Sequence, residues 1–508
     1  MTAGKKILSL EEIKSRLEPL RAAGKTIVHC HGVFDLLHIG HIRYFNQARE
    51  MGDVLVVTLT PDRYVDKGAH RPAFSELLRA EAIASLSVAD YVAVNDWPTA
   101  EETLELLRPN VYVKGAEFKK DGSDRTGKLQ KEIEVVERIG ARMAFAEDIV
   151  FSSSNLINRY LSNFPGEVQE YLGLLRQRYS VETFQDILAD MAGLKVLVLG
   201  ETILDEYHYC EALGKSSKDP VLAVRHQKGE LFAGGILAVA NHVAQFAGQV
   251  TMATVLGETD SQEAFIRSKL APGVEPVFFY QKNAPTIVKR RYLEGYSMSK
   301  LLEVYIMGQG GLDQERDRAF ATWVEEHAAD YDLVLVADYG HDAVSPRMVE
   351  TLCRTAPFLA VNTQANAGNR GFNTISRYPR ADFVSLADHE MRLEVKAANG
   401  MLEPYIKEYG RRMGCAYMVV TRGRKGCSIW SQDERFVEVP AFAQRVVDRI
   451  GAGDAFLSIT ALAARLGVPG EILGFLGNIV GSLAVEIVGN QKSVEKQAVD
   501  KLLTSLLK

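Results

Sequence analysis

HGVFDLLHIGHIRYFNQAREMGD, residues 31–53, begins inside the short strand-like run TIVHCHG (26–32). From Gly40 onward its apolar residues recur at the spacing of helical turns, so the segment predicts a strand, a glycine-containing turn and a helix. This is the repeating unit of a parallel α/β sheet. It leaves the first free N–H groups of the helix pointing toward the turn.

The same alternation of strand-like and helix-compatible segments continues along the chain. In the first part the strand-like segments are residues 26–32, 53–60, 91–95 and 111–115, and the series pauses after residues 142–148. A second, longer series begins at KVLVLG (195–200), and its further strand-like segments are residues 250–257, 332–340, 358–362, 416–423 and 428–430. This pattern predicts two different α/β domains, residues 1–155 and 193–508, joined by a helical connector at residues 156–192.

Composition excludes several classes of protein. The chain has 508 residues, with 47% hydrophobic and 24% charged residues, as expected for a folded water-soluble protein of more than one domain. A net charge of −6 gives no general attraction to nucleic acid or anionic membranes. The five cysteines have no metal-binding or disulfide spacing, and no apolar segment is long enough to export or anchor the chain, so we expect a cytoplasmic protein.

His38 and His41 flank a glycine at the expected helix start. The glycine lets the backbone come close to an anion, and two imidazoles from the same helix end add hydrogen-bond donors. Such a cluster suits the charge that develops on an α-phosphate and a leaving pyrophosphate when a nucleotide is transferred. The alternative is a pair of surface or metal-binding histidines. The preceding strand and Gly40 favour the phosphate interpretation.

Residues 26–159 resemble the cytidylyltransferase-like nucleotidyltransferase family, whose signature is HxGH. The resemblance implies a Rossmann-like parallel sheet and direct in-line attack of a sugar or alditol phosphate on a nucleoside triphosphate, with Mg²⁺ and without a covalent intermediate. It implies catalytic roles for His38, His41 and Lys67, and an acceptor-phosphate contact for Arg79, which could instead be a solvated helix residue. The nucleotide-binding residues it implies are Gly32, Phe34, Asp35, Gly40, Lys114, Gly115, Ser152, Ser153 and Ser154.

VVDRIGAGDAFLSITALAARLG (446–467) places two glycines and Asp454 at the start of a strongly apolar helix. Backbone N–H groups there can hold a transferring phosphoryl group, and Asp454 can take a proton from a hydroxyl nucleophile. The structural alternative is a tightly packed turn with Asp454 as the helix N-cap.

From Lys195 to the C-terminus the chain resembles the ribokinase-like (phosphofructokinase-B) sugar kinase family. The resemblance implies a three-layer α/β/α domain with a small β lid, Asp454 as catalytic base, Mg²⁺ at Asp388 and Glu390, and a homodimer formed through the lid. The sugar-binding residues it implies are Asp205, Gly234, Gly235, Asn241, Arg291 and Asp338. The nucleotide and anion-hole residues it implies are Thr421, Arg422, Gly423, Gly451, Ala452 and Gly453.

Two departures from the kinase family pattern bear on the acceptor and metal contacts. Ala238 stands where the family's GGxxN pattern has asparagine, and Ser385 to Asp388 replace its NxxE. Lys289 and Arg291 share one face of an expected lid strand, where they suit either phosphate binding or an edge that blocks strand pairing. The asparagine-rich segment NTQANAGNRGFN (362–373) suits a ligand loop, with no mechanism assigned to it.

Together the halves resemble the bifunctional heptose-phosphate kinases/nucleotidyltransferases, with the domain order reversed. We therefore expect ATP-dependent phosphorylation of a sugar or sugar phosphate. We also expect nucleotidyl transfer from ATP or CTP to a sugar 1-phosphate or alditol phosphate, giving a nucleoside-diphosphate sugar for cell-surface glycans. The partners expected are these small molecules, with no nucleic acid and no membrane. Two alternatives remain: an active transferase with a non-catalytic kinase-like scaffold, and two phosphate sites that only sense nucleotides.

Overall fold

The computed structural model of the protein describes residues 5–65, 72–115, 128–146 and 164–507. The chain divides into two compact units, and the division falls between Asn163 and Phe164. Each unit has its own sheet and its own buried core, so each is described by itself.

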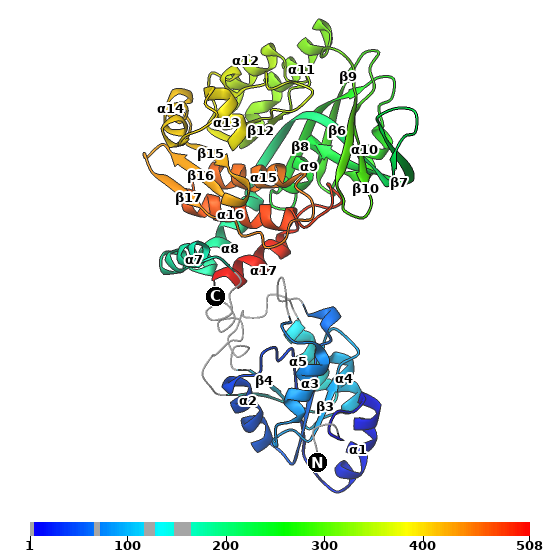
Figure 1. Ribbon diagram of the computed structural model, residues 1–508. Helices are drawn as coiled ribbons and strands as arrows, with labels where there is room; N and C mark the ends of the chain where they lie inside the picture. Colours follow the sequence, from blue (N-terminus) through cyan, green and yellow to red (C-terminus); the bar gives the residue numbers. More distant parts are fainter. Residues whose placement is uncertain (1–4, 66–71, 116–127, 147–163, 508) are drawn as a thin grey trace. The chain divides into compact units, whose positions relative to one another are not determined.

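The first unit is a five-stranded parallel sheet in the order β3-β2-β1-β4-β5 (Figure 1). Its strands are β1 (Ile27–Gly32), β2 (Val54–Leu59), β3 (Tyr91–Val94), β4 (Val111–Lys114) and β5 (Arg142–Phe145). Its helices are α1 (Leu10–Ala22), α2 (Ile39–Glu50), α3 (Glu76–Ala84), α4 (Glu101–Leu107) and α5 (Lys128–Arg138), with a 3₁₀ turn at Asp62–Tyr64. The expected Rossmann-like sheet is confirmed.

Helices cover both faces of this sheet, because alternate strand residues point to opposite sides. Helices α2 and α3 pack on one face, where Phe45 and Ile83 meet Val28 of β1. Helix α1 packs on the other, where Ile13 meets Ile27. The central strand β1 is therefore buried on both sides, and its carboxyl end delivers Gly32 to the start of the loop before α2.

The second unit is built on a mixed sheet in which one long strand, β6 (Lys195–Lys215), takes part in two layers. The other strands are β7 (Leu222–Gly235), β8 (Gln249–Gly257), β9 (Val274–Gln281), β10 (Ile287–Glu294), β11 (Lys300–Ile306), β12 (Leu333–Asp338), β13 (Leu359–Thr363), β14 (Phe383–Ala387), β15 (Tyr417–Thr421), β16 (Cys427–Ser431) and β17 (Phe436–Val439). The first half of β6 pairs with β8 and β12 in the main sheet, whose strand order is β9-β8-β6-β12-β13-β14-β15-β16-β17.

The second half of β6 leaves the main sheet and forms a lid. There it pairs with β7 and β10, and β10 pairs with β11. We call these four strands the lid sheet. The expected lid strand with Lys289 and Arg291 is found as β10, and the ribokinase-like fold with a β lid is confirmed.

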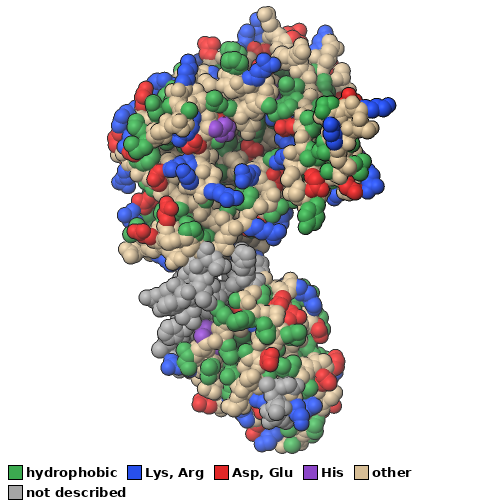
Figure 2. Space-filling model, viewed as in Figure 1, with side chains coloured by type: hydrophobic (Ala, Val, Ile, Leu, Met, Phe, Trp, Pro, Cys, Tyr) green, Lys and Arg blue, Asp and Glu red, His purple; other side chains and the backbone are tan. Residues whose placement is uncertain are grey.

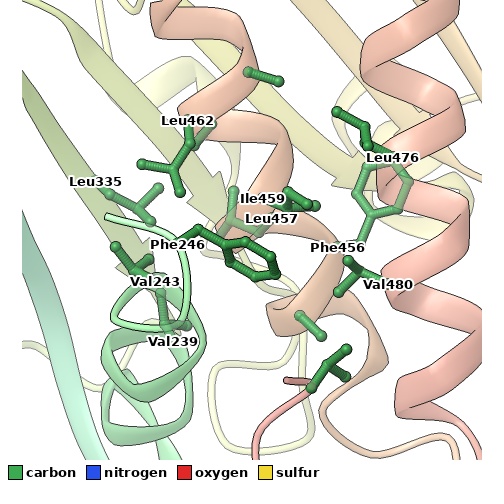
Figure 3. Packing of buried hydrophobic residues seen from close by; sticks show 14 of the residues in the cluster. Val239, Val243, Phe246, Leu335, Phe456, Leu457, Ile459, Leu462, Leu476 and Val480 are labelled. Carbon is green, nitrogen blue, oxygen red and sulfur yellow. The ribbon is translucent and has the colours of Figure 1, made fainter. Parts of the chain in front are cut away.

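Two layers of helices enclose the main sheet (Figure 1). The helices of this unit are α7 (Gly166–Arg178), α8 (Val181–Asp190), α9 (Ile236–Val243), α10 (Glu263–Lys269), α11 (Gln314–His327), α12 (Pro346–Thr355), α13 (Asp388–Val395), α14 (Glu403–Met413), α15 (Ala452–Arg465), α16 (Gly470–Ala484) and α17 (Lys496–Leu507). Helices α9, α15 and α16 pack on one face, and α11, α12 and α14 on the other. Phe456 and Ile459 of α15 lie between α9 and α16 (Figure 3), so α15 is buried nearly all round.

Helices α7 and α8 belong to this second unit rather than to a separate connector. Leu172 and Phe184 join its main hydrophobic core, and the rings of Phe184 and Phe475 lie 5.0 Å apart between centroids. Arg176 also donates to the carbonyl oxygen of Leu506 at 2.7 Å. The apolar faces of these short helices need a surface to pack on, and α16 and α17 supply it. The second unit therefore begins about thirty residues before the predicted boundary at residue 193.

Within the described part of the chain, no helix combines the length and the apolar character needed to cross a bilayer. Basic and acidic side chains are interspersed over the visible face of each unit (Figure 2). Neither unit shows a broad basic surface on this face.

Candidate active sites

The HxGH segment forms the start of α2 in the first unit. His38 is the N-cap of this helix, and its Nδ1 accepts a hydrogen bond from the backbone N–H of Gly40 at 3.1 Å. A neutral ring that accepts at Nδ1 carries its proton on Nε2, where it is a donor. The rings of His38 and His41 lie 4.0 Å apart between centroids, so the helix start brings the two imidazoles together. Partial burial lowers the pKa of His38.

Phe34 and Asp35 shape the loop before α2. A side chain at Gly32 would meet the ring of Phe34 at 3.0 Å, so glycine lets the ring fold back against the strand end. The ring packs edge-on to Phe45 at 4.9 Å and to His41 at 5.5 Å. The buried carboxylate of Asp35 accepts from the backbone N–H groups of residues 73 and 74, which lead into α3. Both residues therefore build the loop on which the histidines stand.

Arg79 is not the solvated helix residue of the alternative reading, because it is 2% exposed. Its guanidinium donates to the carbonyl oxygens of Phe74, Val33 and Thr60 and forms an ion pair with Asp62 at 2.6 Å. These contacts hold the segment before α3 against the ends of β1 and β2. The geometry therefore gives Arg79 a structural role, and its contact with an acceptor phosphate stays a prediction.

Lys114 lies at the carboxyl end of β4, next to Gly115. Its ammonium forms a largely buried ion pair with Glu132 of α5 at 2.6 Å and lies 5.2 Å from the ring of Tyr112. The pair places one cation at the same edge of the sheet as the start of α2. The other expected transferase residues, Lys67, Ser152, Ser153 and Ser154, lie outside the described residues.

Two further histidines lie directly beneath this edge and were not singled out from the sequence. Thr58 Oγ1 lies 2.8 Å from His29 Nε2 and 2.9 Å from His31 Nδ1. Burial lowers the pKa of His29 to about 3, and it lowers the pKa of His31 as well. Both rings are therefore neutral near pH 7, and they connect β1 to β2 below the site.

Asp454 occupies the first turn of α15 in the second unit. Gly451, the N-cap of this helix, has φ 81°, and a side chain there would meet Asn490 Oδ1 at 2.2 Å. Gly451, Ala452 and Gly453 thus form the start of α15, where backbone N–H groups have no carbonyl partner within the helix. The hydroxyl of Tyr339 donates to Asp454 Oδ1 at 2.9 Å.

The electrostatic environment of Asp454 suits a general base. Burial raises its pKa from the usual range to about 7; the carboxylates of Asp205 and Glu390 add to the rise, while the Tyr339 hydroxyl and the Lys289 ammonium oppose it. A carboxylate with a pKa near the working pH can both accept and release a proton.

Asp205, in the lid half of β6, lies close to this helix start. Gly234 is required beside it, because a side chain there would come within 2.1 Å of Asp205 Oδ2. The carboxylate accepts hydrogen bonds from Arg291 and from Asn490 Nδ2, the latter at 3.3 Å. Arg291 also pairs with Glu303 of β11 at 2.8 Å. The glycine pair before α9 therefore makes room for an acidic group at the mouth of the site.

Lys289 lies on the same face of β10 as Arg291, as the spacing predicted. It is 5% exposed, and its ammonium lies 5.0 Å from the ring centroid of Tyr305. Burial lowers the pKa of Lys289. The same tyrosine ring lies 6.1 Å from the ring of His341, whose pKa burial lowers to about 4. The two cations of β10 thus face the site beneath the lid sheet, rather than forming its solvated edge.

Asp338 and Asn241 do not take the positions expected of sugar-binding residues. The Asp338 side chain is 0% exposed and accepts from Asn373, Arg377 and Tyr378. Asn241 bonds to the backbone of residues 269 and 271, which ties α9 to the end of α10. Both side chains therefore stabilise the fold, and a sugar contact of either residue stays a prediction.

The residues expected to bind ATP lie at the end of β15. Thr421 Oγ1 donates to the carbonyl oxygen of Leu386 at 3.4 Å, and Arg422 pairs with Glu438 of β17. Gly423 begins a 3₁₀ turn and has φ 57°. These contacts join β14, β15 and β17 at one edge of the sheet.

The expected magnesium ligands do not fit a metal site in the part of the chain that the structure describes. Asp388 is paired with Arg392 at 2.6 Å, and Glu390 accepts from the backbone N–H groups of residues 365 and 387 at 3.1 and 2.7 Å. No group of three or more His, Cys, Asp or Glu among the described residues could hold a metal ion. Glu390 instead caps α13 and adds negative charge near Asp454.

Sequence reasoning missed four residues of this site: Glu201, Glu303, Tyr339 and Asn490. Glu201 is 1% exposed and accepts from the backbone N–H groups of residues 339 and 341; burial raises its pKa to about 7. Tyr339 follows Asp338 directly. A prediction that assigned the site contact to either of these two residues at the strand end would have included Tyr339. Glu201 and Glu303 are acidic residues in otherwise apolar strands. This unusual placement was the signal in the sequence that could have identified them.

A cavity of about 600 Å³ lies beside the site rather than at Asp454. It opens between the starts of α11 and α12 and the 368–373 part of the asparagine-rich segment, and Gly340 and Asn369 line it. Neither Asp205 nor Asp454 is among its lining residues.

The second unit thus has the architecture of an α/β phosphotransferase, in which a helix N-terminus and a buried aspartate meet beneath a β lid. Residues 194–497 match the pfkB family carbohydrate kinases, and residues 29–159 match the cytidylyltransferase-like family. The chain belongs to the pfkB carbohydrate kinase family and carries an N-terminal cytidylyltransferase-like domain.

Relatives and solved structures agree with this assignment. The bifunctional protein HldE of Syntrophotalea carbinolica is 37% identical over 164 residues, which are 31% of this chain and 32% of that protein. The bifunctional protein HldE of Pelobacter propionicus is 26% identical over 316 residues, which are 61% of this chain and 63% of that protein. The aligned regions thus span less than two thirds of either relative.

The fold of the second unit also resembles a solved kinase. The crystal structure of phosphofructokinase-2 from Escherichia coli in complex with potassium has a TM-score of 0.51 and 16% identity, and the match covers 62% of this chain and 100% of that one. This similarity supports the ribokinase-like fold.

Proposed function

We propose that the protein is a bifunctional enzyme of carbohydrate metabolism, with a sugar kinase site at Asp454 and a nucleotidyltransferase site at His38 and His41. The observation that carries the proposal is the environment of Asp454. A carboxylate with its pKa raised to about 7 lies at a helix N-terminus beside Asp205, Lys289 and Arg291. A buried carboxylate that served only as an N-cap would have no need of these neighbours.

The kinase reaction follows from the geometry at α15. Asp454 accepts the proton of an acceptor hydroxyl, and the hydroxyl oxygen attacks the γ-phosphorus of ATP. The bond from phosphorus to the bridging oxygen breaks and ADP leaves. The backbone N–H groups of Gly451 to Gly453 stabilise the charge on the transferring phosphoryl group. Mg²⁺ would enter bound to the triphosphate, as is usual for this ion.

The acceptor would lie beneath the lid sheet. Asp205 can accept hydrogen bonds from sugar hydroxyls, because a carboxylate has several acceptor positions and Arg291 and Asn490 use only part of them. Lys289 can donate to an oxygen or an anionic group of the acceptor. We propose a sugar or sugar phosphate of the heptose-phosphate type.

The transferase reaction joins a phosphate acceptor to a nucleotide. An oxygen of a sugar 1-phosphate or alditol phosphate attacks the α-phosphorus of ATP or CTP, and pyrophosphate leaves. His38, through its Nε2–H, and His41 stabilise the negative charge on the α-phosphate and the pyrophosphate. The product would be a nucleoside-diphosphate sugar or alditol used for cell-surface glycans.

We also propose a cytoplasmic location and a homodimer formed through the lid sheet.

A crossed pair of variants tests the two activities in the full-length protein. The protein is incubated with Mg²⁺, ATP or CTP and a panel of heptose and pentose phosphates; ADP and pyrophosphate are measured separately, and products are identified by mass spectrometry. Asp454→Asn should abolish ADP formation and leave pyrophosphate release unchanged. His41→Ala should have the opposite effect.

The outcomes separate the competing functions. Absence of pyrophosphate release and of ADP formation with every substrate, from folded protein, would refute the bifunctional proposal. Normal pyrophosphate release together with ADP formation that Asp454→Asn leaves unchanged would favour the scaffold alternative, in which the second unit has no catalytic role. Nucleotide binding without turnover in either unit would favour the sensor alternative.

A further inference from the structure

The backbone of Tyr339 is held at both of its polar atoms. Its N–H donates to Glu201 Oε2 at 2.9 Å, and its carbonyl oxygen accepts from Asn366 Nδ2 at 2.7 Å and from Asn369 Nδ2 at 3.0 Å. The residue is 2% exposed. Side chains from two separate segments thus fix the peptide groups on both sides of Tyr339, immediately after the end of β12.

The two asparagines come from the segment 362–373 and are themselves locked together. The backbone N–H of Asn366 donates to Asn369 Oδ1, and that of Asn369 donates to Asn366 Oδ1, each at 3.1 Å. Gly371 donates to the same Asn369 oxygen at 3.0 Å. We call residues 364–371 the asparagine clamp. The clamp satisfies its own polar groups while it holds Tyr339, so it needs no ligand to keep its shape.

The turn after Tyr339 and the asparagine clamp approach each other so closely that residue 340 must be glycine. Gly340 has φ 70°, and a side chain at this position would come within 2.6 Å of Asn369 Nδ2. The turn after Tyr339 and the clamp therefore fit together only because residue 340 is glycine.

The side chain of Tyr339 points to the candidate catalytic carboxylate. Its hydroxyl donates to Asp454 Oδ1 at 2.9 Å, and no other described side chain is recorded as a hydrogen-bond donor to that carboxylate. The other charged groups that act on Asp454 are Asp205, Lys289 and Glu390. They come from β6, β10 and α13, so the tyrosine is the link between Asp454 and the end of β12.

We infer that Tyr339 is a positioning residue for Asp454, and that the asparagine clamp holds Tyr339 so that its hydroxyl occupies one carboxylate oxygen and leaves the other for the acceptor hydroxyl. The inference rests on the proposed kinase function, which assigns Asp454 the role of base. It gives the asparagine-rich segment, for which the sequence suggested only a ligand loop, a defined task.

The tyrosine has two effects on the carboxylate. It fixes the orientation of the plane of the carboxylate, which decides where the proton-accepting oxygen lies. It also stabilises the ionised form, because a donated hydrogen bond favours the charged state and opposes the effect of burial. Its loss should therefore both misalign the base and raise the pKa at which the base becomes active.

Tyr339→Phe in the full-length protein tests the inference, because it removes the hydroxyl and keeps the ring. The low-pH limb of the kcat profile for ADP formation should move to higher pH by about one pH unit, a roughly tenfold loss of kcat at pH 6, while KM for ATP changes less than threefold. Asn369→Ala should lower kcat in the same direction by a smaller factor.

Tyr409→Phe is the matched control. Tyr409 lies on α14 and is buried in the same unit. Its hydroxyl donates to Glu394 Oε1 at 3.0 Å and not to Asp454. A general loss of stability would affect both variants, whereas only Tyr339→Phe should move the pH limb. An unchanged limb and a kcat within twofold of the wild type in Tyr339→Phe would overturn the inference.

A readout that needs no turnover separates this inference from the proposed function. Between pH 6 and pH 9, the thermal stability of Tyr339→Phe should fall more steeply than that of the wild type, because a higher pKa of Asp454 makes its ionisation in the folded state more costly. The Tyr409→Phe curve should run parallel to the wild type. If the wild type forms no ADP, the proposed kinase fails; parallel curves for all three proteins would still refute the link between Tyr339 and Asp454.

Discussion

Asp454→Asn should make the second unit more stable at alkaline pH. Burial raises the pKa of Asp454 to about 7, from its ordinary value of 3.8. The folded protein therefore holds this proton more tightly than the unfolded chain does. Stability from the protonated carboxyl is fully present below pH 4 and is lost as the pH rises through 7, where the folded state must bear a buried charge.

The size of the effect follows from these two values. By linkage, the ionisable carboxyl costs the folded state about 2 kcal/mol at pH 5 and about 4 kcal/mol at pH 8. These are upper figures, because Asp454 keeps part of its surface open to the site and water there screens the charge. Asparagine carries no charge and can still accept from the Tyr339 hydroxyl, so the variant escapes the cost without losing that bond.

The assay is the free energy of unfolding of the wild type and the variant, measured in urea at pH 5, 6, 7 and 8 with full-length protein. Trp323 and Trp430 report on the second unit, and calorimetry resolves its transition from that of the first. The stability gain of the variant should grow with pH and level off above 7. A gain that is independent of pH, or a variant less stable than the wild type at pH 8, would refute a raised pKa at Asp454.

Three further predictions concern activity and packing. Because Asp454 acts in its ionised form with a pKa of about 7, kcat/KM of the kinase should fall about fivefold from pH 7 to pH 6 in a pH-rate series; a flat profile would show that another group is the base. Gly234→Ala should reduce kinase activity at least tenfold, because the added carbon would lie 2.1 Å from Asp205 Oδ2, whereas Gly481→Ala, with open space around it, should retain normal kinetics. Arg79→Ala should destabilise the first unit by about 3 kcal/mol in calorimetry, because buried carbonyl oxygens lose their donors, and a change below about 1 kcal/mol would contradict the structural role.

Much of each fold could be predicted from local pattern. Apolar strand-like runs separated by helix-compatible segments identified β1 to β5, and a lid strand with Lys289 and Arg291 was expected where β10 lies. Strand β14 escaped notice because Phe383–Ala387 is short and runs directly into α13. The helical character of residues 156–192 was predicted, but the packing of α7 and α8 on the second unit was not, because the sequence of a short helix does not show the surface on which it packs.

The individual site residues show the same difference between local patterns, which the sequence reveals, and long-range contacts, which it does not. Asp454, Gly451 and Gly453 were recognised because a helix N-terminus is a local structure, and glycines and an acid there have a chemical meaning in sequence. Asn490 was not recognised, although it donates to Asp205 across 285 positions of the chain. Contacts of that kind depend on how the whole sheet and its helices assemble.

The sequence by itself therefore determined the two α/β units, the paired histidines at one helix start and the aspartate at another. Only the tertiary structure decided which of two adjacent residues serves Asp454. Consecutive residues in extended chain point in opposite directions, so Asp338 turns to Arg377 while Tyr339 turns to α15. Which of the two residues faces Asp454 depends on the packing of α15 against the end of β12 and on the asparagine clamp that holds the turn. Both come from other segments of the chain.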